Sequence, residues 1–126
     1  MKIQISTDHA IRILQYLHKN GGMYTAMEIA DAVGITYPFF IKIANQLKKH
    51  KFLRSVQGRN GGYVLGKRAH EISLYDVFLC IEGKLQISTS IQRAEQNDCK
   101  LSKAWYSLQS KIIEEMSGQS ISDLAS

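Results

Sequence analysis

Apolar residues recur at helical spacing in two neighbouring stretches of the chain, with a short turn between them. The first stretch has an apolar stripe made of Met27, Ile29, Ala30 and Val33. The second is expected from about Tyr37 to His50 and has a longer stripe made of Phe40, Ile43, Ala44 and Leu47. The pattern predicts two packed helices joined at Gly34, a residue that suits a left-handed helix C-cap.

Capping residues mark the start of both helices. Thr25 and Glu28 have the spacing of a capping box, in which the hydroxyl and the carboxylate each accept a backbone N–H of the other residue. Thr36 is the expected N-cap of the second helix. Pro38 falls in the first turn of that helix, where its missing N–H is not needed. Local chemistry therefore agrees with the hydrophobic pattern.

Two strand-like runs follow, at residues 52–57 and 63–66. The segment between them reads Gly58-Arg59-Asn60-Gly61-Gly62. An Asn-Gly pair favours a tight hairpin turn because both residues tolerate positive φ. The order helix, turn, helix, β-hairpin predicts a winged helix-turn-helix, in which the second helix reads duplex DNA.

The chain before this unit is expected to form one helix. It would run from about Asp8 to Asn20, with Ser6 or Thr7 as its cap, and it would bury Ala10, Ile13, Leu14 and Leu17. Residues 1–6 alternate apolar and polar side chains, which predicts a short strand or an arm.

The chain after the hairpin begins with another capped helix. Ser73 and Asp76 have capping-box-like spacing, and the helix that they open is expected to close at residues 82–83. Cys80 lies on the apolar face of this helix and is interpreted as a core residue. Residues 84–100 have no clear period and predict a polar surface loop.

The last long helix has a heptad-like apolar seam. We expect it over residues 101–116, with a seam made of Leu101, Trp105, Leu108, Ile112 and Met116. Such a seam packs against a partner chain or against the domain's own first helix, and we favour the partner chain. Ser120 and Asp123 predict one more short helical turn. The expected fold class is mainly α with a small β-hairpin, a winged helix-turn-helix plus a long C-terminal dimerisation helix.

Charge is unevenly distributed along the chain, whose net charge is +5. Residues 1–70 carry 11 Lys and Arg against 3 Asp and Glu, whereas residues 71–126 carry 5 against 8. Between Ala32 and His70 there are eight basic residues and no acidic one. This segregation is typical of a nucleic-acid-binding half joined to a neutral or acidic half. A membrane-surface protein would need a basic helix with a broad apolar face instead.

The outward face of the second helix and the hairpin tip carry side chains suited to DNA. Asn pairs bidentately with adenine, Lys with guanine or phosphate, and an aliphatic side chain touches a thymine methyl. The alternative is an ordinary solvated Lys-rich face, but the adjoining hairpin is basic too. The candidate DNA-binding residues are Thr25, Tyr37, Ile41, Lys42, Asn45, Lys48, Lys49, Arg59 and Asn60, with Lys51 as a further phosphate contact.

Two segments resemble a known family of regulators: FIKIANQLKKHKFLRSVQGRNGGYVLGK and ISLYDVFLCIEG. They are similar to winged-helix transcriptional regulators of the IscR and NsrR type, which respond to iron–sulfur status or nitric oxide. The wing with its paired glycines is the most specific part, and STDHAIRIL and ISDLAS near the two ends also fit. The resemblance implies a homodimeric transcription factor, in most members a repressor.

The resemblance also implies a division of one compact unit into three regions. Residues 1–83 would form the DNA-binding winged helix-turn-helix, and residues 84–100 a sensor-type loop. Residues 101–126 would form the dimerisation helix and the C-terminal turn.

The cysteine set implied by the resemblance is incomplete in this chain. Members that bind a cluster place three cysteines before the dimer helix, and Cys99 matches the third, whereas the other two would fall near residues 87–88 and at Arg93. The histidine that some members use would fall at Ser102, and Asp8 matches a carboxylate that some members supply across the dimer. Two metal ligands, Asp8 and Cys99, are too few for an ordinary cluster, which takes four. We therefore expect no cofactor, with an iron–sulfur cluster as the alternative.

Cys99 keeps three interpretations on this sequence. It is a bystander in a loop, or a redox-sensitive thiol activated by Lys100 and the start of a helix, or the remnant of a cluster site. Ile41 is a second departure, because it stands where one branch of the family carries a glutamate that reads bases.

The function predicted is a homodimeric DNA-binding transcriptional regulator, a repressor that senses by a cluster-free or degenerate-cluster mechanism. Its expected partners are double-stranded DNA, a second copy of the chain and a small-molecule or protein co-regulator, without a membrane. The alternative is a winged-helix module that docks a protein. An enzyme is not expected, since the four histidines are scattered and no catalytic constellation stands out. The default location is cytoplasmic.

Overall fold

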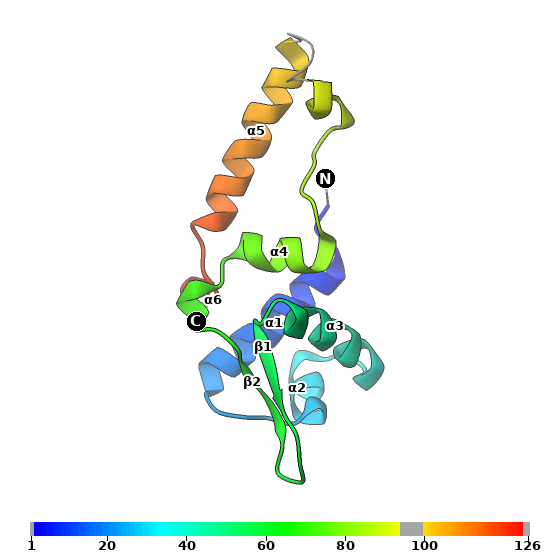
Figure 1. Cartoon of the computed structure of the whole chain (residues 1–126), viewed down its shortest axis with the longest axis vertical. Coiled ribbons are helices and arrows are strands. Elements are labelled where there is room, and N and C mark those ends of the chain that lie inside the picture. The colour runs from blue at the N-terminus through cyan, green and yellow to red at the C-terminus, as the bar shows by residue number, and fades with distance from the viewer. Residues whose placement is uncertain (1, 94–99, 125–126) are drawn as a thin grey trace.

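The structure, a computed structural model, describes residues 2–93 and 100–124. The elements follow in this order: α1 (Ile5–Asn20), α2 (Ala26–Val33), α3 (Tyr37–Lys49), β1 (Leu53–Val56), β2 (Gly62–Leu65), η1 (Ala69–Glu71), α4 (Leu74–Glu82), η2 (Thr89–Arg93), α5 (Lys100–Ser117) and α6 (Ile121–Leu124). Figure 1 shows a lower body of α1, α2, α3 and the hairpin, with α4 above it and α5 extending away. The expected fold class is confirmed: a mainly helical winged helix-turn-helix with a long C-terminal helix.

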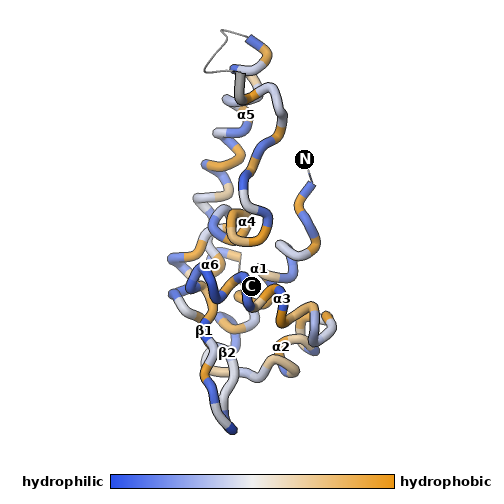
Figure 2. Tube along the Cα trace, turned by 45° about the vertical axis from the view of Figure 1, so that its right-hand side comes forward, coloured by the Kyte–Doolittle hydropathy of each residue, from blue (hydrophilic) through white to orange (hydrophobic). Residues whose placement is uncertain are grey.

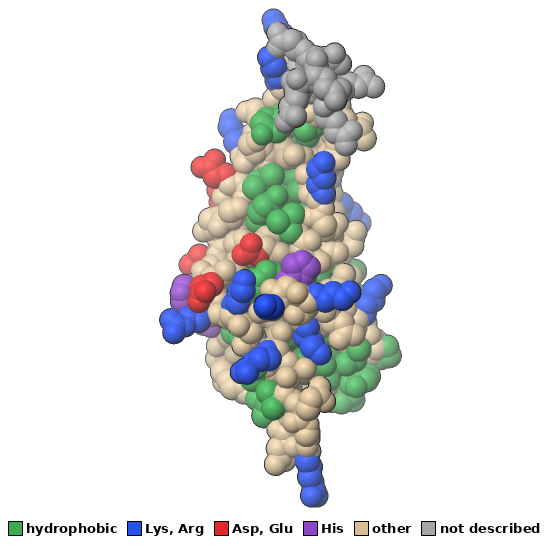
Figure 3. All heavy atoms as spheres, viewed as in Figure 1, with side chains coloured by type: hydrophobic (Ala, Val, Ile, Leu, Met, Phe, Trp, Pro, Cys, Tyr) green, Lys and Arg blue, Asp and Glu red, His purple; other side chains and the backbone are tan. Residues whose placement is uncertain are grey.

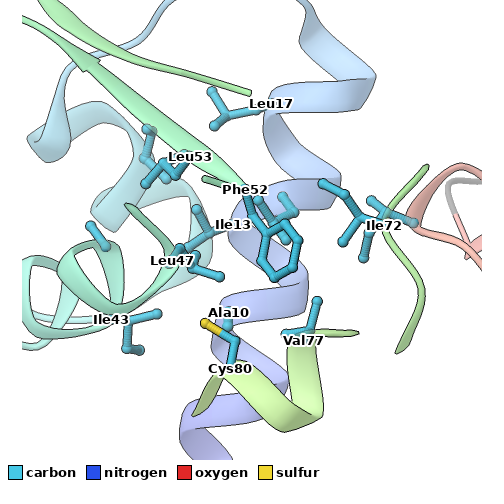
Figure 4. Packing of buried hydrophobic residues seen from close by; sticks show 14 of the residues in the cluster. Ala10, Ile13, Leu17, Ile43, Leu47, Phe52, Leu53, Ile72, Val77 and Cys80 are labelled. Atoms are coloured by element: carbon cyan, nitrogen blue, oxygen red, sulfur yellow. The ribbon is translucent and has the colours of Figure 1, made fainter. Parts of the chain in front are cut away.

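The core lies where α1, α3, α4 and the base of the hairpin meet. Figure 4 shows Ile13 of α1 beside Leu47 of α3 and the Phe52 ring, and Leu17 of α1 on the side of Leu53. The stripes expected on α1 and α3 are fully or almost fully buried: Ala10, Ile13, Leu14, Leu17, Phe40, Ile43, Ala44 and Leu47. Burial of these stripes fixes which face of α3 remains free.

The stripe expected on α2 is wrong at one position. Ile29 and Ala30 are buried, but Met27 is 55% exposed. Met27 precedes Ile29 by two positions, which turns its side chain well away from that residue around a helix. The eight-residue α2 therefore packs through Ile29 and Ala30, with Ala26 and Val33 partly buried against the core.

The start of α1 also differs from the expectation. The helix begins at Ile5 rather than near Asp8, so neither a strand nor a cap at residues 6–7 is present. Thr7 is buried within the helix, and its hydroxyl donates to Glu82 Oε2 at 2.5 Å. The same oxygen accepts the backbone N–H of Gln4 at 3.2 Å. The N-terminus of α1 is thus tied to the end of α4 by a contact between residues far apart in the sequence.

The hairpin is antiparallel, with Leu53 opposite Leu65 and Val56 opposite Gly62. Its second strand also pairs with the segment before α2. Tyr24 N–H donates to Tyr63 O at 3.2 Å, and Tyr63 N–H donates to Tyr24 O at 2.8 Å. This short bridge fastens the wing to the helix-turn-helix.

The chain returns to the winged helix after α5. Leu74 N–H donates to Gln119 O, and Ile121 N–H donates to Ile72 O, each at 2.9 Å. Ile121 is fully buried in the core. The capping pairs expected at Ser73 with Asp76 and at Ser120 with Asp123 are both formed.

The α5 helix carries its apolar seam on the outside of the single chain. Its buried residues are polar, Ser102 and Gln109, and Gln109 Oε1 accepts Ile87 N–H at 2.9 Å. Leu101 is 59%, Leu108 45% and Trp105 38% exposed. Figure 2 shows hydrophobic and hydrophilic positions alternating along α5, and Figure 3 shows apolar side chains gathered over it. The part of the seam from Leu101 to Leu108 is therefore not covered by α1 in the single chain.

The loop expected over residues 84–100 contains η2 and two buried anchors, Leu85 and Ile91. Cys99 and the other residues from 94 to 99 lie outside the described part of the chain. Within the described residues, no helix combines the length and the apolar character that crossing a membrane requires.

Candidate nucleic-acid interface

The helix-turn-helix is held by the local contacts expected from the sequence. Thr25 Oγ1 accepts Glu28 N–H at 3.2 Å, and Glu28 Oε1 accepts Thr25 N–H at 3.1 Å. Gly34 ends α2 in the left-handed conformation, with φ of 83°. The Thr25 hydroxyl is used as a cap, and Thr25 lies at the exposed start of α2.

The free face of α3 is defined by its buried face. Thr36 caps the helix by accepting Phe39 N–H at 3.3 Å. The outward candidates are all accessible to some degree. Exposed are Tyr37, Lys42, Asn45 and Lys49, and half-buried are Ile41 and Lys48. Their amide, ammonium, phenol and aliphatic groups are the groups that read base edges in a major groove.

Tyr63 adds an aromatic group that sequence reasoning missed. Its ring packs edge-on against Phe40, with the centroids 5.2 Å apart. Burial and the neighbouring Tyr37 phenol both raise the pKa of Tyr63, burial being the larger cause. Its hydroxyl therefore stays protonated near neutral pH and is able to donate a hydrogen bond. In the sequence, only the position of Tyr63 directly after the paired glycines of the wing pointed to it.

The wing tip is a turn of a different kind from the one expected. Gly61 N–H donates to Gly58 O at 3.0 Å, which makes Arg59 and Asn60 the central residues. The positive φ falls on Gly58, at 113°, and not on the Asn60-Gly61 pair. Arg59 and Asn60 are exposed, and Figure 3 shows a basic side chain at the end of the hairpin.

The paired glycines serve close backbone approach. A Cβ on Gly61 would lie 2.0 Å from Val56 O, and one on Gly62 would lie 2.5 Å from Tyr24 O. Main-chain oxygens cannot move aside as a flexible side chain can, so a side chain at either position displaces the wing.

We expect Gly61→Ala to destabilise the fold by roughly 1–3 kcal/mol, as overpacking does, and to weaken DNA binding through the displaced wing. Gly118→Ala is the matched control, because its Cβ would meet only ordinary contacts at 3.5 Å and beyond. Thermal unfolding and duplex binding of both variants check this. Equal behaviour of the two variants would contradict it.

The basic residues of this half are not neutralised by acids. None of the eight Lys and Arg between residues 32 and 70 pairs with a carboxylate of the described chain. Figure 3 shows Lys and Arg spread over the lower body and the acidic side chains mostly above them. The surface therefore presents a positive field around α3 and the wing.

Three of these eight basic residues, Arg54, Lys67 and Arg68, were absent from the sequence-based candidates, and Arg54 lies next to α3. Arg54 is exposed on β1, between buried Leu53 and half-buried Ser55. It lines a hollow together with Lys48 and Lys51. The alternation of burial along a strand would have placed it outward.

Within residues 2–93 and 100–124, no set of side chains fits an iron–sulfur cluster. Asp8 is exposed, and Cys99 lies outside the described residues, among which no three His, Cys, Asp or Glu side chains converge. Cys80 is buried, its thiol donates to Gln46 O at 3.3 Å, and burial raises the pKa of the thiol to about 11. Such a thiol is neutral, whereas cluster ligands are thiolates.

Comparison with known proteins decides the family. The model of the family Rrf2, described as "Iron-dependent Transcriptional regulator", matches residues 3–126. The chain belongs to the Rrf2 family. As an Rrf2 protein it is a DNA-binding transcriptional regulator and not an enzyme, and the resemblance read from the sequence is confirmed.

Relatives and solved structures agree with the Rrf2 assignment. Protein aau3 of Rhizobium meliloti is 31% identical, over 98% of this chain and 84% of its own length. The Lactococcus lactis protein YffB, whose name places it among HTH-type transcriptional regulators, is 29% identical over 93% of this chain and 80% of its own.

Among solved structures, CymR, the global cysteine regulator of B. subtilis, superposes with a TM-score of 0.80 at 21% identity, covering 99% of this chain and 96% of its own. IscR of T. potens superposes with a TM-score of 0.73 at 20% identity, covering 98% of this chain and 85% of its own. At these identities the likeness concerns the fold.

Proposed function

We propose that this Rrf2 protein is a homodimeric repressor that binds an operator through α3 and the wing. The observation that carries the proposal is that the Lys and Arg side chains of α3 and the wing pair with no carboxylate of the described residues. A dimer would place one such surface on each half-site. Occupation of promoter DNA then blocks transcription.

Each candidate residue has a chemical role in this proposal. Lys42 and Asn45 read base edges, Ile41 contacts a thymine methyl, and Tyr37 donates to a base or phosphate at the helix start. Lys48 and Lys49 contact phosphates, as does the exposed start of α2 at Thr25. Arg59 and Asn60 lie along the backbone or in the minor groove.

The regions divide this work among them. Residues 1–83 bind DNA, residues 84–100 receive the signal, and residues 101–126 hold the dimer through Leu101, Trp105, Leu108, Ile112 and Met116. The exposure of this seam in the single chain supports dimerisation, because contiguous apolar surface of this kind marks an interaction site.

Sensing in this proposal is cluster-free or uses a degenerate site, with Asp8 and Cys99 as the remaining ligands. We expect protein purified without oxygen to be colourless and free of iron while it still binds DNA. Absorption in the visible range with stoichiometric iron and sulfide would show that Asp8 and Cys99 recruit further ligands.

Two substitutions separate base reading from backbone contact. Asn45→Ala should reduce the preference for operator over random duplex by about 1–3 kcal/mol. Arg59→Ala should weaken binding to both duplexes alike. Titration of labelled operator and random duplex checks both, with Lys84→Ala, an exposed lysine beyond α4, as the control. Unchanged sequence preference in Asn45→Ala would show that this face of α3 does not read bases.

Salt dependence separates DNA binding from the protein-docking alternative. Phosphate contacts release counterions, so duplex binding should fall steeply as salt rises. A flat or absent response would favour a module that docks a protein.

A further inference from the structure

A hollow of about 350 Å³ lies beside α3, at the junction with the wing. It is lined by Lys48, Lys51, Leu53, Arg54, Ser55 and Gly66. Its three basic side chains come from the last turn of α3, from the connection after it and from β1. They converge although they belong to different elements.

Lys51 has an unusual backbone. It is the one non-glycine residue with positive φ in the described chain, at 63°. Lys51 N–H donates to Lys48 O and Phe52 N–H donates to Leu47 O, both at 3.0 Å. These two bonds are those of a Schellman motif, with Lys51 at the position that glycine usually occupies. A side chain is strained there, and such outliers point to function.

Gly66, the residue after β2, lies directly against the backbone of Lys51. A Cβ on Gly66 would lie 2.3 Å from Lys51 O and 3.2 Å from Leu53 N. The end of β2 therefore passes against the backbone of Lys51 and leaves no side chain there. Lys51 therefore occupies a position where glycine is usual, and position 66 has no room for any side chain but that of glycine.

The charges of the hollow are available to a ligand. Lys51 and Arg54 are exposed and Lys48 is half-buried. None of the three pairs with a carboxylate of the described residues. Two ammonium groups and a planar guanidinium fork are complementary to a phosphate, with its several acceptor oxygens.

We propose that Lys48, Lys51 and Arg54 form one binding site for a phosphate of the DNA backbone, next to the groove that α3 enters. The site rests on the proposed function and adds Arg54 and the strained Lys51 to it. It fixes the register of α3 on the duplex and carries no sequence information.

The left-handed backbone of Lys51 makes Lys51→Gly a sharp test. Glycine removes the steric strain of the left-handed backbone, which raises folding stability, but it increases the backbone entropy of the unfolded chain, which lowers folding stability. We expect an unchanged Tm and about fivefold to tenfold weaker binding to operator and random duplex alike at ~0.1 M salt. The slope of log K against log salt should fall by about 1 for each protomer bound.

Arg54→Ala should weaken duplex binding and reduce the slope of log K against log salt by the same amounts. The control Lys84→Ala should change neither the affinity nor the slope. A fall in Tm of Lys51→Gly, with normal affinity, would assign Lys51 a structural role and overturn the proposal. Normal affinity and slope in both Lys51→Gly and Arg54→Ala would also overturn it. The proposed function would then still stand if Asn45→Ala and Arg59→Ala weaken binding.

Inorganic phosphate distinguishes a backbone phosphate from a free one. We expect no change in the Tm of the wild type in millimolar phosphate, because a single free anion lacks the neighbouring contacts of a duplex. A rise in Tm that Lys51→Gly and Arg54→Ala abolish, together with normal duplex binding, would show a free-anion site instead.

Discussion

Trp105→Glu is expected to disrupt the proposed homodimer and leave a monomer. Trp105 lies in the α5 seam between Leu101 and Leu108, and all three side chains are exposed in the single chain. Central aromatic residues dominate interfaces, and a buried unpaired carboxylate adds a further penalty. We expect a loss of about 3 kcal/mol or more, at least ~100-fold in the dimer dissociation constant.

Sedimentation equilibrium of Trp105→Glu measures this directly. Operator affinity should fall with it, since two linked half-sites gain from effective concentration. Ser107→Glu is the matched control, because it adds the same charge at an exposed position of α5 outside the seam. A dimeric Trp105→Glu would show that the seam is not the dimer interface.

Phe40→Ala is expected to cause the largest loss of folding stability. Phe40 is fully buried between the core and the wing, and its ring contacts Tyr63 edge-on. Removing a buried phenylalanine ring costs about 3–5 kcal/mol, against a total stability of roughly 5–15 kcal/mol for a domain. Urea unfolding measures the change, and the wing should loosen because Tyr63 loses its support.

The neighbouring Phe39 provides the control for Phe40→Ala. It is half-buried and packs edge-on against His9, with the centroids 5.6 Å apart. Phe39→Ala should therefore cost clearly less. Equal losses of unfolding free energy in the two variants would mean that the buried stripe of α3 does not dominate the stability of the winged helix.

Features fixed by neighbouring residues could be predicted from the sequence. The capping pairs at Thr25 and Ser73 depend on groups three residues apart, and both are present as expected. The inward stripe of α3 follows from helical periodicity alone, and this stripe defines which residues of the helix face outward. The basic surface required only the order of charged residues.

Features fixed by distant contacts could not be predicted. Thr7 reads as a cap locally, but its hydroxyl is bound to Glu82. Lys51 carries no sign of a left-handed backbone, since that conformation follows from how β1 leaves α3. Arg54 joined the candidate site because β1 passes Lys48 and Lys51, which periodicity within one element does not show.

The pairing of Ser73 with Ser120 has a consequence for how such a chain varies. α4 packs into the core through Val77 and Cys80, and the chain beyond it extends away as η2 and α5 before Ser120 returns to pair with Ser73. We therefore expect the length of the segment between α4 and α5 to vary without shifting α3 and the wing. If residues 84–100 receive the signal, as proposed above, an insertion between Gly83 and Lys100 is expected to alter the response and leave operator preference unchanged. The proposed sensing segment is therefore able to change in evolution independently of the residues of α3 and the wing that are proposed to select the operator.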